Sequence, residues 1–339
     1  MTARRGSWTM RDVGERAGVS PITVSRALAN HASVSPQTRA AVHKAASELG
    51  YVPNFTASAL SKRGSKLIAL LVPNVSNSVF SETINGLNDV LEAAGFALTI
   101  AHSGYSAERE ERLIRTLLGY RPDAVVLTGF THTPGTRMLL KSAGVPVVET
   151  WNIGPKPIDL AVGFSNFEAG LAMTRYLIRK GHKRLAYHGG TQADNERTRA
   201  REEGFRKALS EAGLPMMEPW IRSAPMELAS GAELAREVKA ALAARKAPQA
   251  IFIASDVIAA GFVLEASRIG LRIPKDVAIT GFDDTELGQA VTPPLTSVHV
   301  PQREIGRVAA SLVLQRLRKE RVALTAHDLG FSIVPRESA

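Results

Sequence analysis

The sequence predicts an α/β protein: a small all-α helix-turn-helix head at the N-terminus, followed by a core of two doubly wound parallel-sheet subdomains. Three observations lead to this prediction. The first fifty residues have the pattern of three short helices separated by turn residues. From Leu67 onward, apolar runs such as LIALLV alternate with helical segments, which is typical of parallel strands joined by crossover helices. After Trp151 the same alternation starts again, which indicates two α/β halves of similar size.

Residues 9–29 (TMRDVGERAGVSPITVSRALA) have the pattern of two helices joined by a tight turn. Thr9 is placed to cap the first helix, and Gly18 is placed to end it in the left-handed conformation. Ser20 is placed to cap the second helix, whose first turn contains a proline that needs no amide partner. Ser35 in turn predicts the start of a third helix that stops at Gly50, which completes a three-helix head.

The outward face of the second helix has an unusual composition. With Val24 and Leu28 turned inward, small, hydroxyl-bearing and arginine side chains remain outside, namely Pro21, Ile22, Thr23, Ser25 and Arg26. Such a face fits the major groove of DNA, where an arginine can offer two hydrogen bonds to guanine. We therefore interpret the head as a DNA-binding module.

The charge distribution favours the same interpretation. The net charge is +10, from 42 Lys and Arg against 32 Asp and Glu. Residues 1–66 hold 10 basic and 3 acidic residues, or +7, and the rest of the chain holds 32 basic and 29 acidic residues, or +3. A basic head on a nearly neutral body is typical of a nucleic-acid-binding module attached to a second function.

Composition and motifs argue against other classes of protein. There is no cysteine, so the sequence predicts neither disulfides nor a thiolate metal site, in keeping with the cytoplasm. It contains no membrane-length apolar run and no signal-peptide pattern. The sequence offers no phosphate-binding glycine loop, nucleophile elbow or metal-ligand spacing, so we expect no enzyme, metal or cofactor. A free solute-binding protein with the same core is the second alternative, against which the basic head argues.

The segment 54–66 separates the head (1–53) from the core (67–339). Pro53 breaks the chain, and Asn54 is placed to cap a helix too short to be stable alone. The segment is either a flexible linker or a hinge helix that forms only against its copy from a second subunit on DNA. In the second case Leu60 would be the apolar wedge pushed between base pairs in the minor groove.

The core is expected to fold as two subdomains with a ligand cleft between them. We assign about 67–163 and 294–322 to the first subdomain, and about 164–293 and 323–335 to the second. The segment HDLGFSIVP near the C-terminus has the pattern of one last strand. Ligands of such folds bind beyond the carboxyl ends of the strands.

Over its whole length the chain resembles the LacI/GalR family of bacterial transcription regulators. The resemblance is carried by the head motif TMRDVGERAGVSPITVSRAL, by VSPQTRAAV and ELGYVPN after it, and by FDD, PPLTSVHVP and IGRVAASLVLQRL in the core. Within the family, THTP (131–134), PVVE (146–149), AVGFSNFEA (161–169) and DLGF (328–331) resemble the gluconate-utilisation repressors.

The resemblance implies a core like that of periplasmic sugar-binding proteins and a homodimer on a near-palindromic operator. It places Pro21, Ile22 and Arg26 where the family reads bases, and Leu60 at the intercalating leucine. It also implies phosphate contacts from Thr9, Ser20, Thr23, Ser25 and Asn30. Because many relatives have polar or aromatic residues at 21 and 22, no relative's operator sequence transfers to this chain.

The candidate effector-binding residues lie just after strand ends or at helix starts: Ser76, Ser78, Phe80, His132, Glu149, Trp151, Asn195, Arg197, Arg201, Ser255, Asp256 and Asp283. For a sugar acid, Arg201 with Arg197 near it would hold the carboxylate, and acidic and hydroxyl groups at 255, 256 and 283 would take the hydroxyls. Phe80 or Trp151 would pack on the carbon chain.

Several of these residues have a second interpretation. Asp256 has the position of a helix cap, Trp151 that of a core residue, and His132 that of a plain loop residue. Glu149 would repel an anion unless it is paired. Since Arg197, Arg199 and Arg201 alternate along one helix, at least one of them should face solvent.

The function expected from the sequence is repression of sugar-acid catabolic genes, with gluconate as the first candidate effector. The effector would release the protein from its operator, in a bacterial cytoplasm and at the nucleoid. Alternatives are 2-ketogluconate or another sugar as effector, and an effector that acts as a co-repressor. The absence of a heptad tail after Pro335 favours a dimer over a tetramer.

Overall fold

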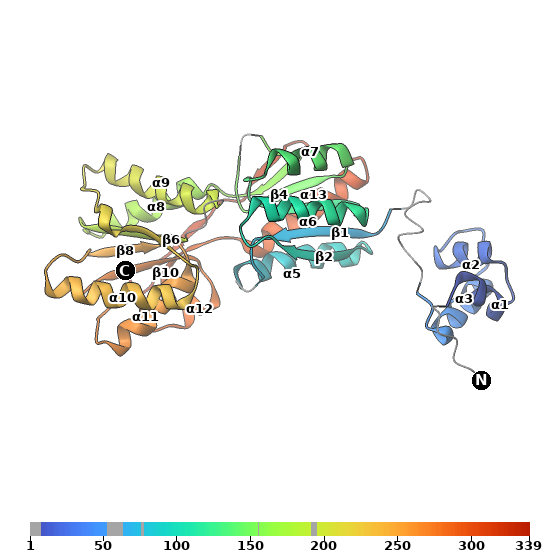
Figure 1. Cartoon of the computed structure of the whole chain (residues 1–339), viewed down its shortest axis with the longest axis horizontal. Helices are drawn as coiled ribbons and strands as arrows, with labels where there is room; N and C mark the ends of the chain where they lie inside the picture. The colour runs from blue at the N-terminus through green and yellow to red at the C-terminus, as the bar shows by residue number, and fades with distance from the viewer. Residues whose placement is uncertain (1–7, 53–63, 76–77, 155, 191–194) are drawn as a thin grey trace. The chain divides into compact units, whose positions relative to one another are not determined.

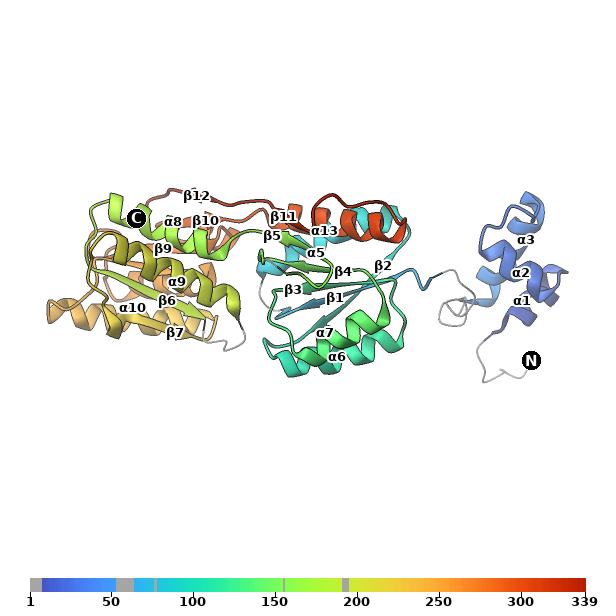
Figure 2. The ribbon, with the colours of Figure 1, turned by 90° about the horizontal axis from the view of Figure 1, so that it is seen from above.

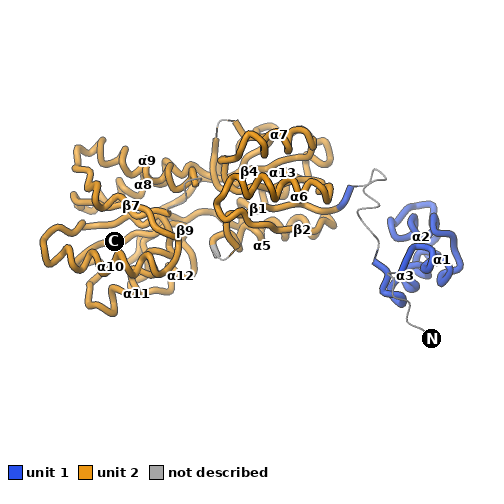
Figure 3. The backbone as a smooth tube through the Cα atoms, in the orientation of Figure 1, with its two compact units in different colours: residues 1–65 blue, residues 66–339 orange. Residues whose placement is uncertain are grey.

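The computed structural model describes residues 8–52, 64–75, 78–154, 156–190 and 195–339. These residues form two compact units, 1–65 and 66–339, which Figure 3 distinguishes by colour. The predictions for Leu60, for the rest of the segment 54–63 and for Ser76 lie outside the described residues, as does the side chain of Ser78.

The head contains three helices, α1 (Met10–Ala17), α2 (Pro21–Leu28) and α3 (Pro36–Leu49), shown in Figure 1. The predicted caps are confirmed, since the hydroxyl oxygens of Thr9, Ser20 and Ser35 each accept a hydrogen bond from a first-turn amide. Asp12 completes a capping box by accepting from the Thr9 amide at 2.8 Å. A small core that includes Val13, Val24 and Val42 joins the three helices.

The first subdomain of the core is a six-stranded parallel sheet of order β11-β5-β4-β3-β1-β2. Its strands are β1 (Leu67–Val72), β2 (Ala97–His102), β3 (Ala124–Thr128), β4 (Val147–Thr150), β5 (Leu160–Gly163) and β11 (Ala326–Asp328). Helices α6 (Ala107–Gly119) and α7 (Pro134–Ala143) cover one face, and η1 (Ser78–Phe80), α5 (Ser81–Ala93) and α13 (Gln302–Leu317) lie on the other (Figure 2).

The second subdomain has a sheet of order β12-β10-β9-β8-β6-β7, in which only β12 is antiparallel to its neighbour. Its strands are β6 (Leu185–Gly190), β7 (Ile221–Ala224), β8 (Ala250–Ile253), β9 (Ala278–Asp283), β10 (Thr296–His299) and β12 (Ser332–Val334). Its helices are α8 (Asn166–Arg179), α9 (Glu196–Glu211), η2 (Glu218–Trp220), α10 (Leu228–Ala243), α11 (Asp256–Arg268) and α12 (Glu286–Ala290). Packing of α8 with α9 on one face and α10 with α11 on the other buries both faces of the sheet.

The sheet pairing corrects the predicted subdomain boundaries at two points. Strand β10 was assigned to the first subdomain, but it pairs with β9 in the second sheet. The single strand expected in HDLGFSIVP is two strands: β11 pairs with β5 in the first sheet, and β12 pairs with β10 in the second. The break falls at Gly330, whose φ of 68° interrupts the extended backbone and lets the chain change sheets.

The part of the chain that the structure describes lacks two further kinds of feature. No helix there is long and apolar enough to cross a membrane. No group of three or more His, Cys, Asp or Glu side chains in that part is arranged to hold a metal ion.

Candidate functional site

The outward face of α2 is largely exposed. Pro21, Ile22, Ser25 and Arg26 are exposed, Thr23 is half-buried, and Ile22 is 66% exposed despite being apolar. Val24 is fully buried, as predicted, and Leu28 packs against the core of the head. The exposed Ile22 and Arg26 side chains are thus both accessible to a ligand outside the chain.

The arginines of the head differ in whether they have partners. Arg16 pairs with Glu48 at 2.7 Å, Arg11 lies 3.4 Å from Glu15, and Arg39 donates to two backbone carbonyls. Among the described residues of the head, Arg26 has no carboxylate partner. Its guanidinium therefore remains available to a ligand outside the chain.

Three of the five residues predicted to contact phosphate lie at helix ends, and Thr23 and Ser25 lie within α2. Thr9 and Ser20 occupy the N-cap positions of α1 and α2, and both are exposed. The Thr9 hydroxyl donates to Asp12 Oδ2 at 2.6 Å, so a phosphate would compete with that acceptor. Asn30 is exposed just after α2, with a φ of 53°.

Half of the predicted effector-binding residues line a hollow between the two subdomains of the core. It is lined by Phe80, Trp151, Asn195, Arg197, Arg201 and Asp283. The remaining lining residues, which were not predicted from the sequence, are Val79, Tyr105, Thr198, Met226 and Ala254. This hollow is the cleft expected beyond the carboxyl ends of the strands, and we call it the effector cleft.

Arg201 is buried and fixed in the effector cleft. Its Nε donates to Asn166 Oδ1 at 2.8 Å, its Nη1 donates to the Ala254 carbonyl at 3.0 Å, and its guanidinium carbon lies 3.4 Å from the centre of the Phe282 ring. Within the described chain, Nη2 makes no hydrogen bond, so the guanidinium retains a donor for a ligand. Burial lowers the pKa of Arg201, and the charge of Asp283 opposes that effect.

Two glycines let helix α9 carry Arg201 into the cleft. A Cβ on Gly170 of α8 would lie 2.2 Å from the Arg201 carbonyl oxygen, and a Cβ on Gly204 of α9 would lie 2.2 Å from the Phe167 carbonyl oxygen. The two helices therefore pack backbone against backbone at this crossing, which no residue with a side chain would permit.

Arg197 also lines the cleft, and its nearest acid is Glu196, whose Oε1 lies 3.7 Å from Nη1. Arg199 is exposed on the same helix. The expectation that one of the three alternating arginines faces solvent is therefore confirmed, and that arginine is Arg199.

Two buried polar atoms of the cleft make no hydrogen bond among the described residues. They are Oδ1 of Asp283 and Nε1 of Trp151, and both residues have left-handed backbone, with φ of 97° and 70°. Burial raises the pKa of Asp283 to about 6, although Arg201 and Arg197 oppose the rise. An acceptor and a donor in the same cleft are therefore both available to a ligand.

His132 and Glu149 are not brought into the cleft. The His132 side chain is fully buried, with Nδ1 2.6 Å from Glu110 Oε1 and Nε2 3.2 Å from Glu149 Oε1. Burial acts to lower the pKa of His132, but the contacts with the two carboxylates outweigh it and raise the pKa to about 9. The structure thus makes His132 and Glu149 partners of each other inside the first subdomain.

Ser255 and Asp256 also lie outside the lining of the cleft. Asp256 is buried and accepts hydrogen bonds from Thr285 N at 2.7 Å and from Ser297 Oγ at 2.8 Å. It is the first residue of α11 rather than its cap, because Ser255 occupies the N-cap position. Asp256 therefore ties α11 to the loop after β9 and to β10.

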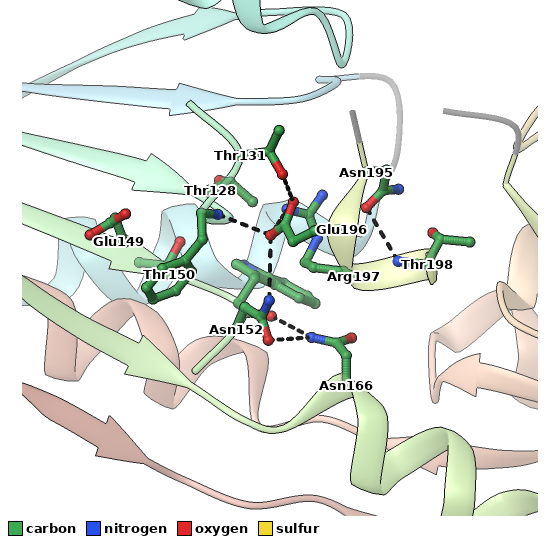
Figure 4. A network of polar contacts seen from close by, with 12 residues as sticks. Thr128, Thr131, Glu149, Thr150, Asn152, Asn166, Asn195, Glu196, Arg197 and Thr198 are labelled. Atoms are coloured by element: carbon green, nitrogen blue, oxygen red, sulfur yellow. Dashed lines mark hydrogen bonds and ion pairs between the residues drawn. The ribbon is translucent and has the colours of Figure 1, made fainter. Parts of the chain in front are cut away.

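Figure 4 shows a polar network beside the cleft that sequence reasoning missed. Glu196 accepts hydrogen bonds from Phe130 N and from Thr131 Oγ1, both at 2.9 Å. Asn166 donates to the Trp151 carbonyl at 2.9 Å and to Asn152 Oδ1 at 3.3 Å. These contacts join residues far apart in the sequence, and only the position of Glu196 beside Arg197 could have drawn attention to it.

Comparisons with known proteins agree with this arrangement. Residues 9–54 match the family of bacterial regulatory proteins named for lacI, and residues 174–339 match a periplasmic binding protein-like domain. The HTH-type transcriptional regulator GntR of Escherichia coli is 38% identical over 328 residues, which cover 96% of this chain and 97% of that protein. GntR of Pseudomonas aeruginosa is 39% identical, with 99% of this chain and 97% of that protein covered.

A solved structure extends the likeness to the fold. The crystal structure of a LacI-family transcriptional regulator from Silicibacter pomeroyi matches with a TM-score of 0.89 at 35% identity, covering 98% of this chain and 99% of that chain. The relatives are transcriptional regulators rather than enzymes. With a matching head, a matching core and relatives of almost equal length, the chain belongs to the lacI family of bacterial regulatory proteins.

Proposed function

We propose that this regulator represses sugar-acid catabolic genes and leaves its operator when a sugar acid such as gluconate binds in the effector cleft. It acts as a homodimer on a near-palindromic operator, in the bacterial cytoplasm and at the nucleoid. The exposed face of α2 reads bases through Arg26 and Ile22, and hydroxyl groups at 9, 20, 23 and 25, with Asn30, hold the phosphates.

One observation carries the proposal: the effector cleft contains two buried arginines together with two buried polar atoms that have no hydrogen-bond partner among the described residues. Arg201 and Arg197 supply cations for a carboxylate. Asp283 Oδ1 accepts a hydrogen bond from a hydroxyl of the ligand, and Trp151 Nε1 donates one. Phe80, whose ring centre lies 5.2 Å from that of Trp151, offers an apolar wall to the carbon chain. A polyhydroxy acid meets all of these requirements.

The choice of gluconate as first candidate is supported by the four core segments that resemble the gluconate-utilisation repressors and by relatives named GntR. Calorimetric titration of the full chain with sodium gluconate, 2-ketogluconate and glucose tests it. We expect gluconate to bind and glucose, which has no carboxylate, to bind at least tenfold more weakly. Equal binding of gluconate and glucose would contradict the assignment of the arginines.

The DNA-reading face yields a prediction of its own. Arg26→Ala should relax the choice of base at one operator position by ~1–3 kcal/mol, because a bidentate pair with guanine is lost. Competition binding against duplexes with single base changes measures this effect. Arg11→Ala is the control, since Arg11 is exposed on α1 and lies 3.4 Å from Glu15. Uniform weakening on all duplexes would instead assign Arg26 to a phosphate contact.

A further inference from the structure

Glu196 connects the two subdomains of the core. It is the first residue of α9 in the second subdomain, and its carboxylate accepts hydrogen bonds from the backbone amide of Phe130 and the hydroxyl of Thr131. Both donors belong to the segment after β3 in the first subdomain, which we call the 130–131 loop. Asn152 adds a longer contact from Nδ2 at 3.5 Å (Figure 4).

The Glu196 carboxylate is closely surrounded, and its neighbours favour its charged form. Gly129 has a φ of 89°, and a Cβ there would lie 2.4 Å from Arg197 Nη1 and 2.6 Å from Glu196 Oε1. Burial acts to raise the pKa of Glu196, but Arg197, the Phe130 amide and the Thr131 hydroxyl outweigh it and lower the pKa. The group that bridges the subdomains is therefore a carboxylate with its own hydrogen-bond donors and a cation beside it.

The 130–131 loop is itself anchored to the first subdomain. Arg137 Nη2 donates to the Phe130 carbonyl at 3.1 Å, and the next residue, His132, is held between Glu110 and Glu149. Thr133 Oγ1 donates to Glu111 Oε2 at 2.5 Å. A displacement of Glu196 would therefore act on the first subdomain as a whole and not on the 130–131 loop alone.

On its other side, Glu196 is covalently next to the residues that face the effector. Arg197 follows it directly, and Arg201 lies little more than one helical turn further along α9. The first turn of α9 therefore carries both the bridge to the first subdomain and a cation of the effector cleft.

We infer that Glu196 is a positioning residue for the effector response: its bridge to the 130–131 loop sets the separation of the subdomains and holds Arg197 at the cleft. Glu196 does not bind the sugar acid itself, since both are anions and its oxygens already have donors. This inference rests on the proposed function, because it deals with how the same cleft responds to its ligand.

The test compares Glu196→Ala with Glu196→Gln in the full chain. Alanine removes the bridge, and we expect gluconate binding to weaken about tenfold, since hydrogen bonds to a charged acceptor are lost. Glutamine restores a bridge: its amide oxygen accepts from Phe130, and its amide nitrogen donates to the Thr131 oxygen. We therefore expect Glu196→Gln to stay within about threefold of the wild-type affinity.

Variants at two further positions keep the test independent of folding defects. Thr131→Val removes one donor of the bridge from the opposite subdomain and should weaken gluconate binding severalfold, whereas Thr131→Ser should not. Glu202→Gln on the same helix, where Glu202 pairs with Arg206 at 2.9 Å away from the cleft, is the matched control and should leave affinity unchanged.

Hydrogen exchange of the peptide that contains Phe130 supplies a readout without effector, because its amide loses an acceptor in Glu196→Ala and should exchange faster. Wild-type gluconate affinity in Glu196→Ala, or equal weakening in the alanine and glutamine variants, would overturn the inference. A wild-type chain that does not bind gluconate would instead refute the proposed function, and faster exchange would still report the bridge.

Discussion

Arg201→Ala is expected to abolish the response to gluconate while operator binding persists. Arg201 is buried and fixed by Asn166 at 2.8 Å and by the Ala254 carbonyl at 3.0 Å, so it presents its remaining donor at one place in the cleft. Truncating one partner of a buried charge pair costs ~2–5 kcal/mol of binding. Calorimetry should therefore show gluconate affinity falling at least about thirtyfold.

The matched control is Arg199→Ala, because Arg199 is exposed on the same helix between the two cleft arginines. It should leave both gluconate and operator affinity unchanged. Arg201→Lys should fail to restore binding, since lysine cannot reproduce the planar fork that reaches Asn166 and Ala254 while stacking on Phe282. Retention of gluconate affinity within about threefold in Arg201→Ala would place the carboxylate site elsewhere.

Among the variants proposed, His132→Ala is expected to lower the free energy of unfolding the most. It leaves the carboxylates of Glu110 and Glu149 buried without the cation between them. Removing one partner of a buried ion pair typically costs ~3–5 kcal/mol. Urea unfolding followed by circular dichroism measures the loss, and His102→Ala, at an exposed histidine at the end of β2, serves as the control.

The free energy of unfolding lost in His132→Ala is expected to decrease as the pH rises. The folded-state pKa of His132 is raised to about 9, above the usual value of 6.5 for histidine. Protonated His132 therefore contributes its full stabilisation below about pH 6.5, and the contribution is lost as the pH rises through about 9. The difference between wild type and His132→Ala should shrink over that interval. A difference that grows with pH would show that the buried histidine is neutral.

Local sequence signals predicted the head well. Thr9, Ser20 and Ser35 cap the helices because a short polar side chain before a helix satisfies a first-turn amide, and this rule depends only on nearby residues. The alternation of strands and helices in the core was equally readable, since central strands such as β1, β3 and β8 are apolar along almost their whole length.

Pairing between distant segments was less predictable. The sequence does not show that β10 hydrogen-bonds to β9, or that Gly330 divides the last strand between two sheets, because both depend on partners that folding brings together. For the same reason His132 was assigned to the cleft. Its partners, Glu110 and Glu149, lie on different elements, and only the fold brings them to either side of one imidazole ring.

The effector cleft was predicted in part for a related reason. Arg197, Arg201 and Asp283 were predicted to line it because each is a charged residue just after a strand or early in a helix, and all three do line it. Glu196 was missed because its role consists of contacts with the 130–131 loop, about 65 residues earlier in the chain. A single carboxylate at the start of a helix looks like an ordinary first-turn acid.

We propose that a sugar acid bound in the effector cleft controls the affinity of the head for operator DNA. The most direct test measures gluconate affinity by calorimetry for the free full-length chain and for its complex with an operator duplex selected from a random pool. Linkage requires that operator binding weaken gluconate binding by the same factor by which gluconate weakens operator binding. We predict such a reciprocal factor of at least tenfold, and equal gluconate affinity with and without operator would contradict the account.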